Sequence, residues 1–144
     1  MSACLDAYAI LCWLQDEPGA ELVERHLTAG ARDRESRCPI SVINLGEVFY
    51  RIGRTRGLAE AEGFWEDVRR GEVPVRVVES TRKRVREAAA LKARYPIAYA
   101  DAFAIQLALE RGLPLLTGDP EMKSVEGKEP LELLWLGSGP EDTH

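Results

Sequence analysis

The sequence predicts an α/β fold in which a central, mostly parallel sheet carries helices on both faces. Short apolar or valine-rich segments alternate with longer amphipathic ones, and this alternation is typical of parallel sheets. The chain has 144 residues, of which 45% are hydrophobic, enough for one domain with a buried core. We therefore expect a single domain over residues 1–136 and a frayed polar tail over residues 137–144.

The first half of the chain is expected to form two strands and three helices. The apolar run that ends at Asp6 predicts a short buried strand, and a second strand is expected just before Ser41, which suits a helix N-cap. Pro18 favours the first turn of a helix, and Gly30 and Gly57 favour helix ends. The expected elements are strands over 3–6 and 36–40 and helices over 8–14, 18–30 and 42–56.

The second half is expected to form three strands and three helices. Gly71 and Gly112 favour helix ends, and either Ser80 or Thr81 can cap the helix that follows a valine-rich strand. The last strand is the weakest and is expected at an edge of the sheet. The expected elements are strands over 73–78, 113–117 and 131–136 and helices over 58–70, 80–94 and 99–111.

No apolar run approaches the roughly 20 residues that span a bilayer, and the N-terminus does not resemble a signal peptide. The three cysteines, Cys4, Cys12 and Cys38, share no metal-ligand spacing. We expect them to be buried, reduced thiols of a cytoplasmic protein that has no membrane partner.

The net charge of −5 is unevenly distributed. Residues 51–94 contain 12 Arg or Lys and 7 Asp or Glu, whereas the rest of the chain contains 7 and 17. Such a basic segment could contact the phosphates of a nucleic acid. Arginine-rich helix faces in contact with solvent are an equally common explanation, so composition leaves both interpretations open.

Four acidic residues stand where their carboxylates could converge. Asp6 and Asp119 follow predicted strands, and the carboxyl ends of strands are where open α/β sheets place their sites. Glu47 and Asp101 lie on predicted helices between them. Because converging carboxylates repel one another, they need a cation among them. This arrangement points to divalent metal and phosphate chemistry.

Each acid also has an ordinary structural explanation. Asp6 could cap a helix, Asp101 could interact with a helix dipole, and Asp119 could form an Asx turn before proline. Glu47 could pair with Arg51, four residues further on.

The helix of Glu47 is unusual because it is apolar on two sides. Leu45, Val48, Phe49 and Ile52 form one stripe, and Glu47 lies nearly opposite it between Ile43 and Tyr50. We therefore expect this helix to be sandwiched between other elements, or its Ile43/Tyr50 side to form a homodimer surface. Asn44 could line the same site as Glu47.

These residues resemble the PIN-domain ribonucleases, especially the small VapC-like toxins of prokaryotic toxin–antitoxin pairs. The resemblance covers nearly the whole chain, and it rests on the order and spacing of motifs that are each short. The landmarks are a first strand ending in Asp6, helical Asn44-Leu-Gly-Glu47-Val-Phe-Tyr50, Ala100-Asp101-Ala102 and Thr117-Gly-Asp119.

The resemblance implies a three-layer α/β/α sandwich and an Mg²⁺- or Mn²⁺-dependent endoribonuclease, usually dimeric and often inhibited by an antitoxin protein. It implies that the catalytic and metal-binding residues are Asp6, Glu47, Asp101 and Asp119, with Asn44 and Thr117 as supporting polar groups. Many relatives carry Ser or Thr directly after the first Asp, whereas this chain has Ala7. The neighbouring hydroxyl would then come from Tyr8 or be absent.

The expected mechanism uses one or two metal ions that polarise the scissile phosphate and activate a water for in-line attack. His26 and His144 do not suit a general acid–base pair, because one lies in an acidic helix and the other is the last residue. Arginines of the basic segment would contact phosphates of the RNA substrate, and the candidates are Arg51, Arg54, Arg82 and Arg86.

Two other interpretations stay open. One is a different doubly wound enzyme, either a phosphoaspartate receiver or a haloacid-dehalogenase-like phosphatase. The phosphatase pattern needs an acid where this chain has Tyr8, and the receiver needs a lysine after a late strand, for which Lys123 is near enough. The other is a catalytically inactive PIN-like binding module, and its only support in the sequence is Ala7.

Overall fold

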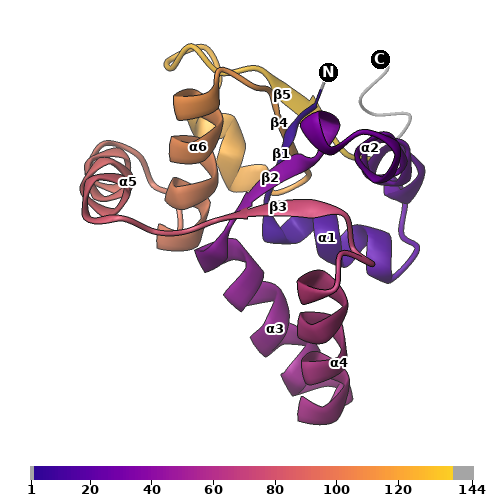
Figure 1. The fold of residues 1–144 in the computed structure, drawn as a ribbon. Helices are drawn as coiled ribbons and strands as arrows, with labels where there is room; N and C mark the ends of the chain where they lie inside the picture. The colour runs from indigo at the N-terminus through magenta and orange to yellow at the C-terminus, as the bar shows by residue number, and fades with distance from the viewer. Residues whose placement is uncertain (1, 138–144) are drawn as a thin grey trace.

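The computed structural model describes residues 2–137, and its centre is a five-stranded sheet in which every neighbouring pair of strands is parallel (Figure 1). The strand order is β3-β2-β1-β4-β5. The strands are β1 (Cys4–Leu5), β2 (Cys38–Ser41), β3 (Val75–Val78), β4 (Leu115–Thr117) and β5 (Leu133–Trp135). The expected parallel sheet and its weak edge strand are confirmed. The tail expected over residues 137–144 lies outside the described residues, apart from Gly137.

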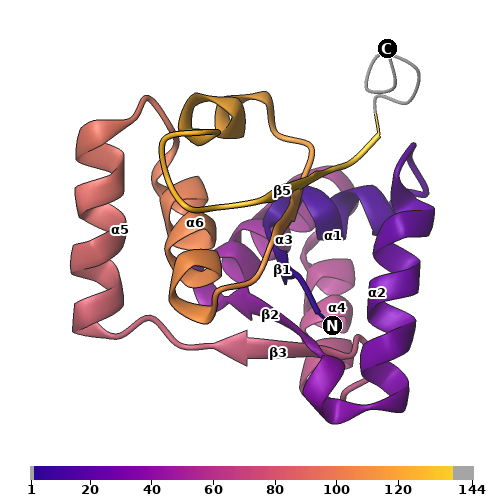
Figure 2. The ribbon, with the colours of Figure 1, turned by 90° about the horizontal axis from the view of Figure 1, so that it is seen from above.

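Helices cover both faces of the sheet, as Figure 2 shows. Four helices pack on one face through a large apolar cluster, and two helices and a 3₁₀ turn pack on the other. The first group is α1 (Ala7–Leu14), α2 (Ala20–Arg32), α3 (Val42–Arg56) and α4 (Leu58–Arg69); the second is α5 (Arg82–Arg94), α6 (Tyr99–Arg111) and η2 (Pro120–Val125). The predicted three-layer α/β/α sandwich is therefore correct.

The strands divide their side chains between the two apolar clusters. Leu5 and Leu116 are paired in register and contribute to the cluster under α1–α4, whereas Cys4 and Leu115 contribute to the cluster under α5 and α6. This division follows from the alternation of side chains along a strand. Both layers of helices thus need apolar residues in the same short strands, which explains why the strands read as continuous apolar runs.

Most element boundaries agree with the sequence expectation within two residues. The helix α6 has the expected ends, and α3 begins after its predicted cap, Ser41. The strand β2 starts two residues later than expected because Asp33 caps a 3₁₀ turn, η1 (Arg34–Ser36), through its side chain. The 3₁₀ turn η2 was not expected as an element, but its N-cap, Asp119, accepts the hydrogen bond from the backbone N–H of Glu121 that is typical of the Asx turn offered by the sequence.

The helix α3 is not sandwiched along its whole length, which corrects the sequence expectation. Ile43 packs against the cluster under α5 and α6, but Tyr50 is 45% exposed. The end of α3 that carries Tyr50 forms a hairpin with α4 that extends away from the sheet in Figure 1. The Ile43/Tyr50 side is therefore not one continuous apolar surface. A homodimer stays a prediction, but an apolar second face of α3 no longer supports it.

The topology places a switch point between β1 and β4. The chain leaves β1 toward β2 and β3 on one side and returns to β4 on the other side of β1. In open parallel sheets, sites form at the carboxyl ends of strands where the order reverses. The residues that follow β1 and β4 are Asp6 and, after Gly118, Asp119.

All three cysteines are free and buried, as expected. Within residues 2–137, we find no helix that combines the length and the apolar character needed to span a membrane.

Candidate functional site

Asp6 lies below the surface at the end of β1 and is 1% exposed. One carboxylate oxygen, Oδ1, accepts a hydrogen bond from the backbone N–H of Ala9 (2.9 Å), so Asp6 is the N-cap of α1. The other, Oδ2, accepts a hydrogen bond from the hydroxyl of Thr117 (2.5 Å) on the neighbouring strand. Both oxygens are thus engaged by the protein, and Asp6 ties β1, α1 and β4 together.

Thr117 links Asp6 to Asp119. While its hydroxyl donates to Asp6, the same Oγ1 atom accepts a hydrogen bond from the backbone N–H of Asp119 (3.1 Å). The resemblance implied that Thr117 is a supporting polar group of the site, a role that stays a prediction. The hydroxyl of Thr117 points at Asp6, and by accepting the Asp119 N–H the same oxygen stabilises the turn at residues 117–119.

Asp101 lies in the first turn of α6, with only 6% of its surface exposed. Its Oδ2 atom is buried and accepts no hydrogen bond from the described residues, so the ionised carboxylate is without a partner, whereas the protonated acid can share its proton with Asp119. An unpartnered buried carboxylate is costly, so such a group calls for an explanation.

Asn44 holds the start of α6 in place. It is fully buried in α3, and its Nδ2 group donates a hydrogen bond to the carbonyl of Ala100 (3.0 Å), the residue before Asp101. Its Oδ1 atom, like the Oδ2 atom of Asp101, has no partner among the described residues. Asn44 does not line the pocket described below, which differs from the expectation that it would line the site.

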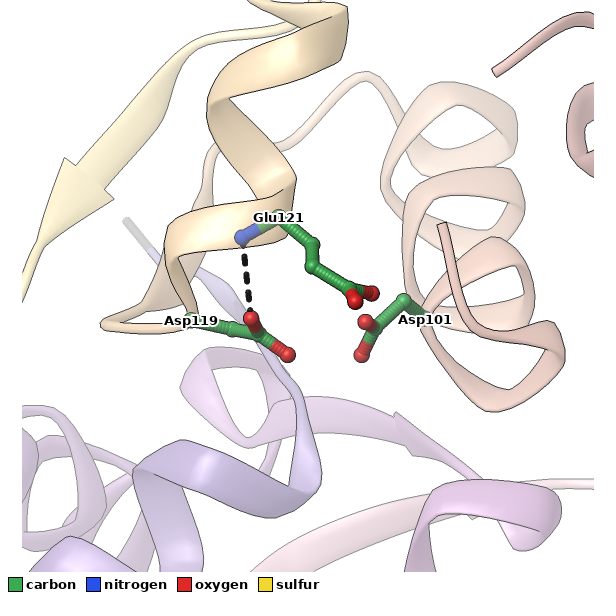
Figure 3. Close-up of side chains that lie close together, drawn as sticks. All are labelled: Asp101, Asp119 and Glu121. Atoms are coloured by element: carbon green, nitrogen blue, oxygen red, sulfur yellow. Dashed lines mark hydrogen bonds between the residues drawn. The ribbon is translucent and has the colours of Figure 1, made fainter. Parts of the chain in front are cut away.

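Asp119 and Glu121 complete a group of three carboxylates with Asp101. Each residue offers one oxygen, and these oxygens all lie within 4.8 Å of one another. Figure 3 shows Glu121 extending from η2 toward Asp101, while Oδ1 of Asp119 accepts a hydrogen bond from the backbone N–H of Glu121 (3.0 Å). Oε1 of Glu121 also accepts a hydrogen bond from the N–H of Ala98, next to α6 (3.0 Å). The turn η2 and the start of α6 are therefore joined through acidic side chains.

Glu121 was missed at the sequence level. Its signal was available in Asp119-Pro120-Glu121, because an Asp cap followed by proline and a second acid is typical of the first turn of a helix. That pattern predicts a turn, but it does not predict that the second acid reaches a different helix.

An open pocket of about 480 Å³ lies over these acids. Three of the four predicted acids, Glu47, Asp101 and Asp119, line it, whereas Asp6 lies beneath it. Glu47 is paired with Arg51 across one helical turn (Oε2 to Nη2, 3.3 Å), the ion pair that the sequence offered as its ordinary explanation. The pocket thus has an acidic floor in which Glu47 has a cationic neighbour.

The buried acids resist ionisation. Burial is the main reason that the pKa of Asp6 is raised from 3.8 to about 7, although its hydrogen bonds from Thr117 and Ala9 act in the opposite direction. Burial also raises the pKa of Asp101 to about 8, with further increases from the neighbouring acids, Asp119 first. Both shifts arise first from burial, and the neighbouring acids add to them.

Ala7 and Tyr8 lie next to Asp6 and both line the pocket. Ala7 is almost fully buried, whereas Tyr8 is 42% exposed. Tyr8 thus brings a phenol to the pocket, and whether its hydroxyl replaces the one missing at position 7 stays a prediction.

The four candidate arginines fall into two pairs. Arg51 and Arg54 line the pocket from α3, whereas the exposed Arg82 and Arg86 lie on α5 and do not line it. Among the described residues, Arg54, Arg82 and Arg86 form no ion pair. Only the α3 pair is thus placed to contact a ligand in the pocket.

The residues present fit a divalent metal ion. Three carboxylates can each contribute an oxygen, the donor that Mg²⁺ and Mn²⁺ prefer, and one of those carboxylates has a buried oxygen without a partner. A cation would also relieve the repulsion that raises the pKa of Asp101. The arrangement can therefore bind a hard cation and bring it to a phosphate in the pocket.

The family model described as PIN domain matches residues 3–128 of the chain. The search of curated proteins found no match to this chain. Among solved structures, VapBC2 from Rickettsia felis bound to a promoter DNA fragment is 15% identical, with 95% of this chain and 100% of that chain covered and a TM-score of 0.70.

Two further structures have the same fold. DNA-bound VapBC from Salmonella typhimurium is 18% identical, with 93% of this chain and 97% of that chain covered and a TM-score of 0.67. VapC20 from Mycobacterium tuberculosis, a toxin described as cleaving the sarcin-ricin loop, is 16% identical, with 86% and 95% covered and a TM-score of 0.67. At these identities the likeness establishes the shared fold.

Proposed function

Because this chain belongs to the PIN-domain family, we propose that it is an endoribonuclease that hydrolyses RNA phosphodiester bonds with the help of Mg²⁺ or Mn²⁺. The observation that carries the proposal is the group of three neighbouring carboxylates, Asp101, Asp119 and Glu121, in which Asp101 also has a buried oxygen without a hydrogen-bond partner among the described residues. A protein maintains such a group at a cost in stability, and that cost is typical of functional sites.

Asp101, Asp119 and Glu121 would hold the metal ion, and Glu47 lines the pocket together with the first two. When bound, the ion supplies polarisation of the scissile phosphate and a more acidic water. Asp6 adds negative charge from below, and its hydrogen bonds with Thr117 and Ala9 keep the ends of β1 and β4 together. Arg51 and Arg54 would contact RNA phosphates beside the acids.

The test is cleavage of a mixed single-stranded RNA by the purified protein with Mn²⁺, with Mg²⁺ or with EDTA. We expect cleavage in the two metal samples and none with EDTA. Asp119→Asn should abolish it, whereas Glu129→Gln, an acid outside the pocket that pairs with Arg94, should not. Full cleavage by Asp119→Asn, or by the wild type in EDTA, contradicts the proposal.

We also propose that the chain is the toxin of a toxin–antitoxin pair. Two of the three structures described above are VapBC complexes, which supports a partner of the antitoxin class. An arginine from such a partner could neutralise the acidic pocket with bidentate geometry. Co-purification with the protein encoded beside it, together with loss of RNA cleavage in the complex, tests this; an equally active complex contradicts it.

The other enzyme classes receive no support. Lys123 was the residue that left the phosphoaspartate-receiver interpretation open. Its ammonium lies over the ring of Trp135, 4.8 Å from the centroid, and Lys123 does not line the pocket. An inactive binding module is distinguished by calorimetric titration with Mn²⁺. We expect binding that Asp101→Asn abolishes, whereas an inactive module would show none.

A further inference from the structure

Two tyrosines from different helices line the pocket and keep much of their surface exposed. Tyr8, in α1, is 42% exposed, and Tyr50, in α3, is 45% exposed. Tyrosine rings are usually buried in a core or an interface, because each one contributes a large apolar area. Two exposed rings in the pocket that contains Asp101 and Asp119 therefore suggest that a ligand covers them.

The position of Tyr8 is determined by Gly118. A Cβ atom at position 118 would overlap with the ring of Tyr8, so the ring occupies the space that any other residue would fill. Gly118 lies between Thr117 and Asp119. The ring of Tyr8 is thus held beside the acidic floor.

Tyr50 stands in a basic part of the pocket. The guanidinium of Arg54 lies over its ring, 5.1 Å from the centroid, and Arg51 is the next residue of α3. One face of the ring is thus occupied by a cation. Exposed rings beside arginines are the combination with which proteins hold single-stranded nucleic acid, since the arginines contact phosphates and the rings stack on bases.

We propose that Tyr8 and Tyr50 form a base-stacking subsite for unpaired nucleotides of the RNA that the pocket cleaves. This inference rests on the proposed function and names two residues that would hold bases of its substrate. Base pairs in a duplex are stacked on one another, so their faces are not available to the two rings. Because every base has an aromatic face, the subsite tolerates any base but requires that one is present.

The test compares two oligomers with equal charge. One is a fluorescein-labelled decamer of adenylate, and the other is a decamer of abasic ribose phosphates. Binding is measured by anisotropy with Ca²⁺ in place of Mg²⁺, and the integrity of the RNA is checked on a gel. We expect the wild type to bind the decamer with bases about tenfold more tightly or better, as base–aromatic stacking predicts.

Variants of the two rings should reduce this preference without changing binding of the abasic decamer. Tyr8→Leu and Tyr50→Leu should each lower the ratio of the two affinities several-fold, whereas Tyr8→Phe, which retains the ring, should preserve it. Gly118→Ala should lower the ratio as well, because its Cβ displaces the ring of Tyr8.

A matched control is Tyr99→Leu. Tyr99 is 44% exposed, does not line the pocket, and packs on Phe103 with ring centroids 5.2 Å apart. It lies about 200° around α6 from Asp101, on the other side of the helix. We expect its variant to keep the wild-type ratio.

Two outcomes overturn the inference. One is a wild type without preference for the decamer with bases, which includes a wild type that binds neither decamer; the other is that the Leu variants keep the full preference for bases. In the last case the two rings are free for another ligand, such as a segment of a protein partner. Cleavage of RNA by the wild type and its loss in Asp119→Asn are measured separately, so the nuclease proposal can stand when the stacking subsite fails.

Discussion

The helix α6 carries an acid near each end, and the two acids have opposite surroundings. Near the C-terminal end, Glu110 accepts hydrogen bonds from Arg84 (2.9 and 2.8 Å) and from Gln106 (2.9 Å). The guanidinium of Arg84 is the main reason that the pKa of Glu110 is lowered to about 2. In the first turn, Asp101 has only acids as charged neighbours, and burial with their repulsion raises its pKa to about 8.

This contrast separates an acid that is compensated by the described residues from one that is not, and the uncompensated acid is the one we propose as functional. Glu110 is compensated by residues of its own chain, and its ion pair with Arg84 joins α5 to α6. Asp101 is left uncompensated in a molecule with many arginines, several of which pair with other acids. Natural proteins tolerate such local conflicts mainly where a ligand resolves them.

The largest expected effect concerns cleavage. Asp101→Asn should reduce RNA cleavage by about 100-fold or more, because it removes a metal-binding carboxylate whose ion contributes several kcal/mol to transition-state stabilisation. Glu110→Gln should leave the rate per folded molecule within about twofold of the wild type, because Glu110 does not line the pocket. Initial rates in Mn²⁺ measure both, and equal losses in the two variants would remove the distinction between the acids.

The second effect is stabilisation by the metal. Mn²⁺ at about 100 times its dissociation constant should increase the free energy of unfolding by about 2.7 kcal/mol. Asp119→Asn should lose most of this increase, whereas Glu87→Gln, at the other end of the α5–α6 pair, should retain it. Thermal denaturation with and without Mn²⁺ measures the difference, and a retained shift in Asp119→Asn would place the ion elsewhere.

The third effect is on the pH dependence of the free energy of unfolding, to which the pocket acids and Glu110 contribute with opposite slopes. The raised pKa values of Asp6 and Asp101, about 7 and about 8, favour the protonated acids in the fold. That stability is complete below their ordinary value of 3.8 and is lost as the pH rises through about 7 and 8. The pKa of Glu110 is lowered from 4.5 to about 2, so its stabilisation is present above 4.5 and is lost as the pH falls through about 2.

Melting temperatures in EDTA should therefore decrease between pH 5 and pH 8.5 and also decrease at strongly acidic pH. Asp101→Asn should flatten the decrease above pH 5, and Glu110→Gln should flatten only the acidic one. A decrease above pH 5 that is unchanged in Asp101→Asn would mean that the pocket acids do not cause it.

The smallest expected effect concerns the arginines. Arg54→Gln should weaken binding of single-stranded RNA several-fold and reduce the dependence of log K on log salt by about 0.7, as loss of one phosphate contact predicts. Arg82→Gln is the matched control, because Arg82 is also exposed and forms no ion pair within the described chain, yet it does not line the pocket. Anisotropy titrations at several salt concentrations test both, and equal effects would move the RNA path to α5.

Much of the fold was predictable because its signals are local. Ser41, Thr81 and Gly112 occupy the caps that their chemistry favours, and the apolar runs correspond to the strands. That the residues after β1 and β4 lie at one edge of the sheet was also predictable from parallel topology, although the group of neighbouring carboxylates joins Asp119 to Asp101 and Glu121 and does not include Asp6. The site assignments themselves stay predictions that the experiments above address.

Other features depend on neighbours that are distant in the sequence. Glu121 reaches α6 only because η2 folds against it, and Thr117 is directed at Asp6 because β1 and β4 are adjacent in the sheet. None of these contacts has a periodic pattern that a sequence could display.

Periodicity and capping in this chain determine where helices and strands form and which ends of the strands carry acids. Whether an acid is compensated was decided by the tertiary structure, because charge and burial act through space. Glu110 and Asp101 are nine residues apart on one helix, yet packing against α5 supplies one with an arginine, and packing against η2 supplies the other with more carboxylates.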